Sequence, residues 1–310
     1  MKRRVCVCQS TLKTTRKSIL EDKLFDKEKD NDAYWTTHNY TKYKDEFKGN
    51  DPEKKENEYK IMSYNVNGIN ASIKKGLIDF INTEKADIVC LQETKLQHKN
   101  RVEMPEYKHH YYNYSTNKKG YSGTAVLSKI KPINVTYTLN EKTHNDGRII
   151  TVEFDNFYLV NTYVQNSGRK LENLEKRAKE WDVDLKSHIH RLSLSKKVIW
   201  CGDMNVVLRW SDLAKPKEWL RCCGFTKEER KGTSDILECA NLIDPFVSLY
   251  PHKVAFYTFF PYVDIKKLSG MRADYFFVSK ECENCVTKYY KRDVKYSEFV
   301  ICELLCIVTH

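Results

Sequence analysis

The chain has 310 residues, with 53 Lys and Arg against 42 Asp and Glu, which gives a formal net charge of +11 at pH 7. Hydrophobic residues make up 41% and charged residues 31%, which is typical of a folded chain and excludes a collagen-like or wholly disordered one. No stretch approaches the roughly 20 apolar residues of a membrane-spanning helix, and no apolar run follows the basic start, so we expect neither a membrane segment nor a secretory signal. A positive surplus suits a polyanionic partner such as a nucleic acid, although many basic proteins bind none.

The first 57 residues differ in composition from the rest. They are rich in Lys, Asp, Glu and Asn, and the segment 51–56 mixes both signs of charge. Low hydrophobicity leaves too little buried surface to offset the entropy lost on ordering. We therefore expect residues 1–57 to form a largely disordered tail and residues 58–310 to form a single domain.

The 11 cysteines are an odd number, which favours reduced thiols in the cytosol or nucleus. Cys282 and Cys285, followed by Cys302 and Cys306, also have spacings that a structural zinc site could use. The second pair, however, lies in the apolar run 299–308, which is typical of a buried strand or short helix. We favour buried free thiols and keep zinc as the alternative.

Strand and helix patterns alternate from residue 59 onward. An alternating segment over 60–66 ends near Gly68, as a strand entering a turn does, and helical spacing follows over 73–81 with Ser72 placed as its cap. The apolar run 87–93 is typical of a strand buried on both faces. Further strands are predicted at 123–128, 148–154, 158–164, 198–201 and 274–279, and helices at 171–194 and 226–242. These elements predict one α/β domain with packed sheets; His188 and His190, on the first of the two helices, are expected at the surface.

Several of these strands end in polar residues. Asn65 closes the first strand, Glu93 the second, Tyr163 lies at the end of a third, and Asp203 follows a fourth. Sites in such folds tend to lie on loops where strands end, so these side chains are candidates for one shared site. Each also has an ordinary explanation, since an Asn or Asp can be a turn residue and Tyr163 a core tyrosine.

Taken together and in order, the motifs resemble the exonuclease III / AP-endonuclease family of the endonuclease–exonuclease–phosphatase superfamily. The resemblance runs from about Tyr59 to about Ser279. Its motifs are Ser63-Tyr64-Asn65-Val66-Asn67-Gly68-Ile69, Leu91-Gln92-Glu93-Thr94-Lys95, Gly120-Tyr121-Ser122-Gly123, Asp146-Gly147-Arg148, Tyr163-Val164-Gln165-Asn166-Ser167-Gly168-Arg169, Cys201-Gly202-Asp203-Met204-Asn205-Val206, Gly224-Phe225-Thr226-Lys227-Glu228-Glu229-Arg230, Tyr257-Thr258-Phe259 and Arg272-Ala273-Asp274-Tyr275.

The resemblance implies a four-layer α/β sandwich of the deoxyribonuclease I-like type, in which two facing mixed sheets are flanked by helices. It implies Mg²⁺-dependent hydrolysis of the DNA backbone at abasic sites, with Mn²⁺ as a substitute metal and 3′-exonuclease or 3′-phosphodiesterase activity as an addition. The implied partner is double-stranded DNA with abasic or 3′-blocked sites, bound by a monomer. A nuclear location is favoured over a cytoplasmic one.

The resemblance also implies roles for individual residues. Glu93 and Asn67 match metal-site positions, and Asp203 and Asn205 match the pair that orients and deprotonates the attacking water. The implied metal set is Glu93, Asn67, Asp203, Asn205 and Glu298. The implied catalytic set is Tyr163, Asn166, Asp203, Asn205 and Asp274, of which Tyr163 and Asn166 hold the scissile phosphate. The implied DNA contacts are Asn65, Arg169, Phe259, Met271 and Ala273.

Two features depart from the family pattern. Where the family has Gly-Ser-Asp-His, this chain has Tyr296-Ser297-Glu298-Phe299, so Asp274 loses the histidine that normally pairs with it. Losing such a group typically lowers the rate by about 10²–10⁴-fold. The alternative reading is therefore an impaired or inactive DNA-binding member, and a misread terminal segment 299–310 is a further alternative.

The second departure concerns the abasic pocket. Phe259 keeps an aromatic wall, whereas Met271 and Ala273 stand where family members carry Trp and Leu. A smaller and more flexible wall predicts weaker discrimination against intact nucleotides.

Overall fold

The computed structural model describes residues 58–97, 102, 104–139, 145–254, 256–260 and 270–292, together with the backbone of residues 301–306. The expected tail at 1–57 lies outside the described residues, as do Glu298 and Phe299. Within the described part, no helix is long and apolar enough to cross a membrane.

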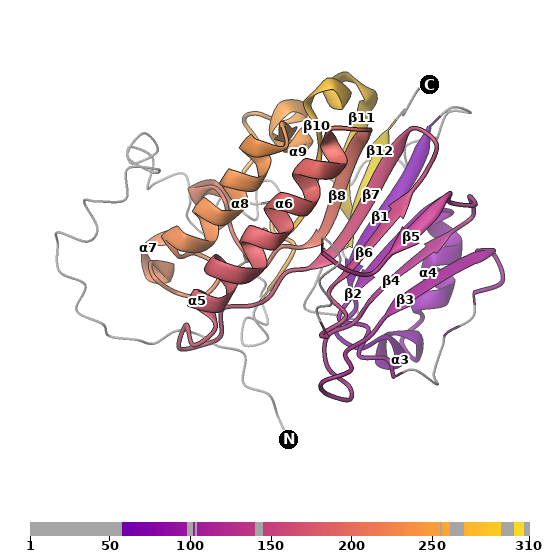
Figure 1. Ribbon diagram of the computed structural model, residues 1–310, viewed down its shortest axis with the longest axis horizontal. Coiled ribbons are helices and arrows are strands. Elements are labelled where there is room, and N and C mark those ends of the chain that lie inside the picture. Colours follow the sequence, from indigo (N-terminus) through magenta and orange to yellow (C-terminus); the bar gives the residue numbers. More distant parts are fainter. Residues whose placement is uncertain are drawn as a thin grey trace.

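Two six-stranded sheets face each other (Figure 1). The first has the order β11-β12-β1-β2-β4-β3 and the second the order β5-β6-β7-β8-β10-β9. The pairs β1–β2 and β7–β8 are parallel and the other pairs are antiparallel, so both sheets are mixed. The strand bounds are β1 Tyr59–Asn65, β2 Ile88–Gln92, β3 His109–Asn113, β4 Thr124–Ser128, β5 Asn134–Thr136, β6 Ile149–Glu153, β7 Phe157–Tyr163, β8 Lys197–Asp203, β9 Leu242–Ile243, β10 Asp274–Ser279, β11 Val286–Arg292 and β12 Ile301–Cys306.

Helices cover the outer face of each sheet (Figure 1). The helices against the first sheet are α3 Ile69–Ile73 and α4 Leu77–Glu84. Those against the second are α5 Leu174–Lys176, a π-helical turn Arg177–Trp181, α6 Asp182–Ser193 and α8 Lys227–Cys239. The shorter elements are α7 Pro216–Trp219, α9 Pro245–Leu249 and 3₁₀ turns at Trp210–Asp212 and Lys280–Cys285. The predicted four-layer sandwich is confirmed.

The period of two along each strand builds three hydrophobic layers. On β1 and β8, Ile61 and Ile199 point into the core between the sheets. Their neighbours on the same strands point outward, Met62 against α3 and α4 and Trp200 against α6 and α8. Both faces of the central strands are therefore buried, which explains why they read as nearly continuous apolar runs.

Several local predictions need correction. The helix expected over 73–81 is two short helices, because Gly76 adopts a left-handed φ of 96° at the start of α4. Ser72 lies inside α3 and caps nothing; its hydroxyl donates to the carbonyl of Val66. His188, expected at the surface, is buried and contacts the Thr151 hydroxyl. Within the segment 299–308, for which strand and helix were both open, the described residues 301–306 form β12, which pairs with both β1 and β11.

Candidate active site

Polar residues occupy one end of the space between the sheets. The rows of side chains that face this space end in Asn65 on β1, Gln92 on β2, Tyr163 on β7, Asp203 on β8 and Asp274 on β10. Strand register brings them together, since Asn65 lies opposite Gln92, and Asp203 lies opposite both Tyr163 and Asp274. The core therefore changes from apolar to polar at the edge where these strands end.

Hydrogen bonds join the two sheets at this edge. The Asn65 amide donates to Oδ2 of Asp203 at 2.8 Å and to Oε1 of Glu93 at 3.2 Å, so one amide connects two carboxylates. One layer deeper, the Gln92 amide donates to Oδ1 of Asn161 at 2.8 Å. Asn65, Gln92 and Asn161 are all fully buried, so these bonds fix the relative position of the sheets in a site that excludes water.

The two oxygens of Glu93 have different partners, a neutral hydroxyl on one and a positive charge on the other. The Tyr163 hydroxyl donates to its Oε1 at 2.8 Å. The Lys95 ammonium lies 2.9 Å from its Oε2 and also donates to Oδ1 of Asn67. The oxygens of Glu93 and Asn67 thus converge on a single positive charge.

The loops that carry these groups have an unusual backbone. Asn67, Glu93, Lys95 and Asn205 have φ angles of 46°, 51°, 53° and 47°. Asn tolerates the left-handed region, whereas Glu and Lys rarely adopt it. Such conformations cost free energy and are typical of functional sites held by their surroundings.

The turn after β8 presents Asp203 and Asn205. Gly202 precedes them with a φ of 131°, and a Cβ at this position would lie 1.9 Å from the Thr162 carbonyl oxygen, so only glycine fits. The Asn205 backbone N–H donates to Oδ1 of Asp203 at 2.9 Å, and Asn166 donates to Oδ1 of Asn205 at 2.8 Å. The two predicted motifs therefore meet through these side chains.

Burial and mutual repulsion alter the titration of the acidic groups. Burial raises the pKa of Asp203 to about 7, and the charge of Glu93 acts in the same direction, against hydrogen bonds from Asn205 and Asn65. Burial, followed by the charge of Asp203, raises the pKa of Asp274 well above its usual value. Burial and the charge of Glu93 likewise raise the pKa of Tyr163, which keeps its hydroxyl protonated and able to donate.

A cavity of about 270 Å³ opens beside these groups. Its walls contain nine of the predicted site residues, namely Glu93, Tyr163, Asn166, Arg169, Asp203, Asn205, Phe259, Met271 and Ala273. Trp219, Cys223 and Gly224 complete the lining. The main-chain groups of Phe259 and Met271 exchange hydrogen bonds of 2.9 Å, which holds two of the walls together.

The remaining predicted residues lie behind or beside the cavity. Asn65 and Asn67 connect to it through Glu93, as described above. Asp274 accepts from the Thr258 hydroxyl at 2.7 Å, while its buried Oδ1 has no hydrogen-bond partner among the described residues. Glu298, the other predicted metal ligand, lies outside the described residues.

Sequence reasoning missed three groups that support the site. Lys95 belongs to one of the family motifs, but sequence reasoning assigned no role to it; in the structure its ammonium lies between Glu93 and Asn67. Arg177 and Glu229 are fully buried and ion-paired beneath the Asn205 turn. The Thr226-x-x-Glu229 spacing is a readable capping-box signal, whereas nothing in the local sequence distinguishes Arg177 from a surface arginine.

The donor set fits a hard divalent cation. In the described part of the chain, no three His, Cys, Asp or Glu side chains gather closely enough to hold a metal by themselves. Mg²⁺ does not require this, because it is commonly bound by one or two carboxylates and keeps several waters. Glu93 and Asn67 already place hard oxygens around the Lys95 charge. Burial first, and neighbouring carboxylates second, raise the pKa values of Asp203 and Asp274, and a cation bound beside them would favour their charged forms.

The chain is a two-sheet α/β sandwich with carboxylates and amides gathered where the strands of both sheets end. The model of the endonuclease/exonuclease/phosphatase family matches residues 62–290, so the chain belongs to this family. The resemblance identified from the sequence motifs is thereby confirmed.

Relatives with known names support the same assignment. A "DNA-(apurinic or apyrimidinic site) endonuclease" of Dictyostelium discoideum is 41% identical over 237 residues, covering 74% of this chain and 65% of the relative. The "DNA repair nuclease APEX1" of Danio rerio is 44% identical over 227 residues, covering 71% of this chain and 73% of the relative. Among solved structures, an AP endonuclease from Leishmania major matches with a TM-score of 0.73 and 27% identity, covering 81% of this chain and 88% of that one. This chain thus spans slightly less than two thirds of the Dictyostelium relative.

Proposed function

We propose that this protein is a divalent-metal-dependent DNA phosphodiesterase that cleaves the backbone at abasic sites. The observation that carries the proposal is the Asn65 amide, which bonds both Glu93 and Asp203 at the wall of the 270 Å³ cavity. Metal-site and water-orienting groups are thereby held next to a space that can receive a sugar without its base. The names of the relatives point in the same direction.

Mg²⁺ is the metal that fits the site, with Mn²⁺ as its substitute. Glu93 and Asn67 would hold it, and Glu298 is proposed as a further ligand on sequence grounds alone. When bound, the ion supplies positive charge that stabilises the developing negative charge on the phosphate oxygens.

The chain's own residues supply orientation and proton transfer. Asp203, fixed by Asn65 and by the Asn205 N–H, has a pKa of about 7 and can accept the proton of an attacking water near neutral pH. The Tyr163 hydroxyl and the Asn166 amide reach the same cavity. Asn166 can donate to a phosphate oxygen, and Tyr163 can do so when its single O–H turns away from Glu93. Asp274 lies opposite Asp203 in the register of β10 and β8 and is held there by the hydrogen bond from the Thr258 hydroxyl.

The cavity also determines which DNA is preferred. Phe259, Met271 and Ala273 form one apolar side, and Arg169 faces the cavity from an exposed loop where it can contact the backbone. Because Met271 and Ala273 are less bulky and less rigid than Trp and Leu, we propose that 3′-blocked ends are also accepted. The net charge of +11 supports a polyanionic partner, which we propose to be double-stranded DNA. We further propose a monomer that acts in the nucleus.

Metal binding and strand cleavage test the proposal together. The melting temperature of the full chain should be measured with and without Mg²⁺. Separate, unheated samples should be assayed under the same two conditions for nicking of a duplex with one abasic site. We expect Mg²⁺ to raise the melting temperature and to be required for nicking, and Glu93→Gln to lose most of both effects. Glu106→Gln, at an exposed position away from the site, is the matched control and should behave as the natural chain. Absence of both effects in the natural chain would refute the proposal.

A further inference from the structure

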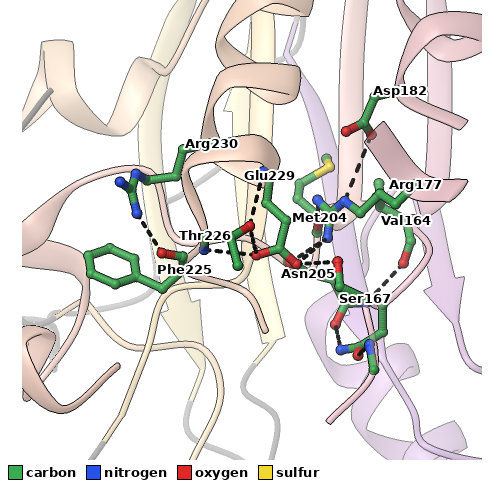
Figure 2. A network of polar contacts seen from close by, with 12 residues as sticks. Val164, Ser167, Arg177, Asp182, Met204, Asn205, Phe225, Thr226, Glu229 and Arg230 are labelled. Carbon is green, nitrogen blue, oxygen red and sulfur yellow. Dashed lines mark hydrogen bonds and ion pairs between the residues drawn. The ribbon is translucent and has the colours of Figure 1, made fainter. Parts of the chain in front are cut away.

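A fully buried arginine lies directly beneath the Asn205 turn. Arg177 donates to the backbone carbonyl of Asn205 at 2.7 Å and to that of Met204 at 2.9 Å (Figure 2). These two carbonyls belong to the residues that follow Asp203, and Asn205 has a left-handed φ of 47°. A planar guanidinium can bond both oxygens at once, which a lysine ammonium cannot do with the same geometry.

Glu229 connects this arginine to the loop that carries Asn166. Its Oε1 lies 3.3 Å from the Arg177 guanidinium and accepts from the Ser167 hydroxyl at 2.5 Å, and both charged side chains are fully buried (Figure 2). Its Oε2 accepts from the backbone N–H and hydroxyl of Thr226, which closes the capping box of α8. One carboxylate therefore ties together the start of α8, the loop after β7 and the arginine under the turn after β8.

The bonds of this cluster form a closed circuit through the site. Asn166, next to Ser167 in the chain, donates to Oδ1 of Asn205, whose carbonyl is held by Arg177. The circuit thus runs Arg177, Glu229, Ser167, Asn166 and Asn205, and returns to Arg177. It closes on two side chains that line the cavity, so its geometry sets the geometry of the site.

The surroundings of the Arg177–Glu229 pair indicate that it does more than stabilise the folded chain. Arg177 begins a π-helical turn between α5 and α6, a rare element that is frequent at functional sites. Asp182, 3.8 Å from the same guanidinium, is buried with burial raising its pKa to about 6, and its Oδ2 has no hydrogen-bond partner among the described residues. Buried ion pairs of this kind are weak evidence for stability. The presence of this buried ion pair is better explained by the positions of the loops that it fixes.

We infer that Arg177 and Glu229 are positioning residues for the nuclease reaction, which hold Asn205 and Asn166 in register with Asp203. The inference rests on the proposed function for its catalytic readout. Neither residue lines the cavity, so both act through the groups that they hold. A displacement of about 1 Å at a reacting group can cost about 10²-fold in rate.

The experiment compares the full natural chain with Arg177→Lys, Glu229→Gln, the double variant and a core control, Ile236→Val. Ile236 is buried on α8 in the apolar cluster against the second sheet and takes no part in the polar circuit, so its loss of a methyl group reports general destabilisation. We expect Arg177→Lys and Glu229→Gln each to lower kcat on an abasic duplex by about 10–100-fold, with KM changed by less than about 3-fold. The double variant should be little worse than the poorer single variant, because both act on one circuit.

Amide hydrogen exchange supplies a readout that does not depend on cleavage. The amides of residues 166–168 and 204–206 should exchange faster in Arg177→Lys and Glu229→Gln, while the strands keep their protection; Ile236→Val should show no such local effect. Unchanged kcat, a loss in KM alone, or uniform exchange across the chain would overturn the inference. If the natural chain does not cleave DNA, the proposed function fails, and the exchange pattern still decides whether the two residues position the loops.

Discussion

Asn65 and Asp203 are separated by 138 positions in the chain, yet the amide of the first donates a 2.8 Å hydrogen bond to the carboxylate of the second. Asn65 ends β1 in one sheet and Asp203 ends β8 in the other, so this bond spans the two sheets. Together with the bond from the Asn205 N–H, it offsets part of the free energy that burial of the Asp203 carboxylate costs. The hydrogen bond therefore joins the architecture of the sandwich to the chemistry of its edge.

Removing the Asp203 charge should stabilise the metal-free protein progressively as the pH rises from acid to neutral. The pKa of Asp203 is about 7 in the folded chain against 3.8 ordinarily, so the folded state binds a proton more tightly and its stability falls as pH rises through this window. At about 1.4 kcal/mol per pH unit, the upper limit of this loss is about 4 kcal/mol. Asp203→Asn should therefore gain stability relative to the natural chain between pH 5 and pH 8, as measured by urea unfolding without metal. A constant difference across that range would contradict the assignment.

His188 should make the protein sensitive to acid. Burial, helped by the charge of Arg191, lowers the pKa of His188 to about 4 from an ordinary 6.5. Between pH 6.5 and pH 4 the unfolded chain therefore binds a proton at His188 that the folded chain does not bind. The contribution of neutral His188 to the free energy of unfolding is fully present above pH 6.5. It falls as the pH drops toward 4, by up to about 3 kcal/mol.

His188→Gln tests this directly, since glutamine can still bond the Thr151 hydroxyl but does not titrate. Urea unfolding at pH 7, 6 and 5 should show a smaller loss of stability in the variant than in the natural chain. Identical losses in both would show that other groups cause the acid sensitivity.

The apolar wall of the cavity should control substrate discrimination. Ala273→Leu adds bulk to a wall shared with Met271 and Phe259, and should raise the preference for an abasic duplex over a matched intact duplex by about 10-fold. The ratio of kcat/KM on the two duplexes measures this. Ser234→Ala, on the exposed side of α8, is the control. A natural chain that already prefers the abasic strand strongly, with no gain in the variant, would show that the wall is not the cause.

With Phe299 at the family's histidine position, we expect DNA cleavage to be slower but not abolished. The buried Oδ1 of Asp274 has no hydrogen-bond partner among the described residues, which do not include Phe299, and the sequence has Phe299 where the family pattern has a histidine. Phe299→His should raise kcat by about 10²-fold or more if the imidazole reaches Asp274. The same assay on both chains gives the comparison. Equal kcat values would show that Asp274 functions without such a partner.

Sequence reasoning predicted the fold and named most of the residues that line the candidate site, for identifiable reasons. Strands buried on both faces are long apolar runs, and their polar ends, such as Asn65 and Asp203, mark the shared edge. Short edge strands such as β5, with its exposed and half-buried residues, carry too little periodicity to be recognised. Arg177 could not be found, because whether a charged side chain is buried depends on contacts between distant segments. The spacing of Glu229 from Thr226 marks it as a capping residue, but not as the partner of Arg177. His188 was misplaced for the same reason, since its partner Thr151 lies on β6.

The most direct test is single-turnover nicking of a duplex with one abasic site by the full chain and by Asp203→Asn, each with Mg²⁺ and with a chelator. We predict that the natural chain nicks the strand at the abasic site only when Mg²⁺ is present, and that Asp203→Asn is slower by at least about 10²-fold while still binding the duplex. Nicking that persists in the chelator, or an Asp203→Asn chain as fast as the natural one, would contradict a metal-dependent reaction at this site.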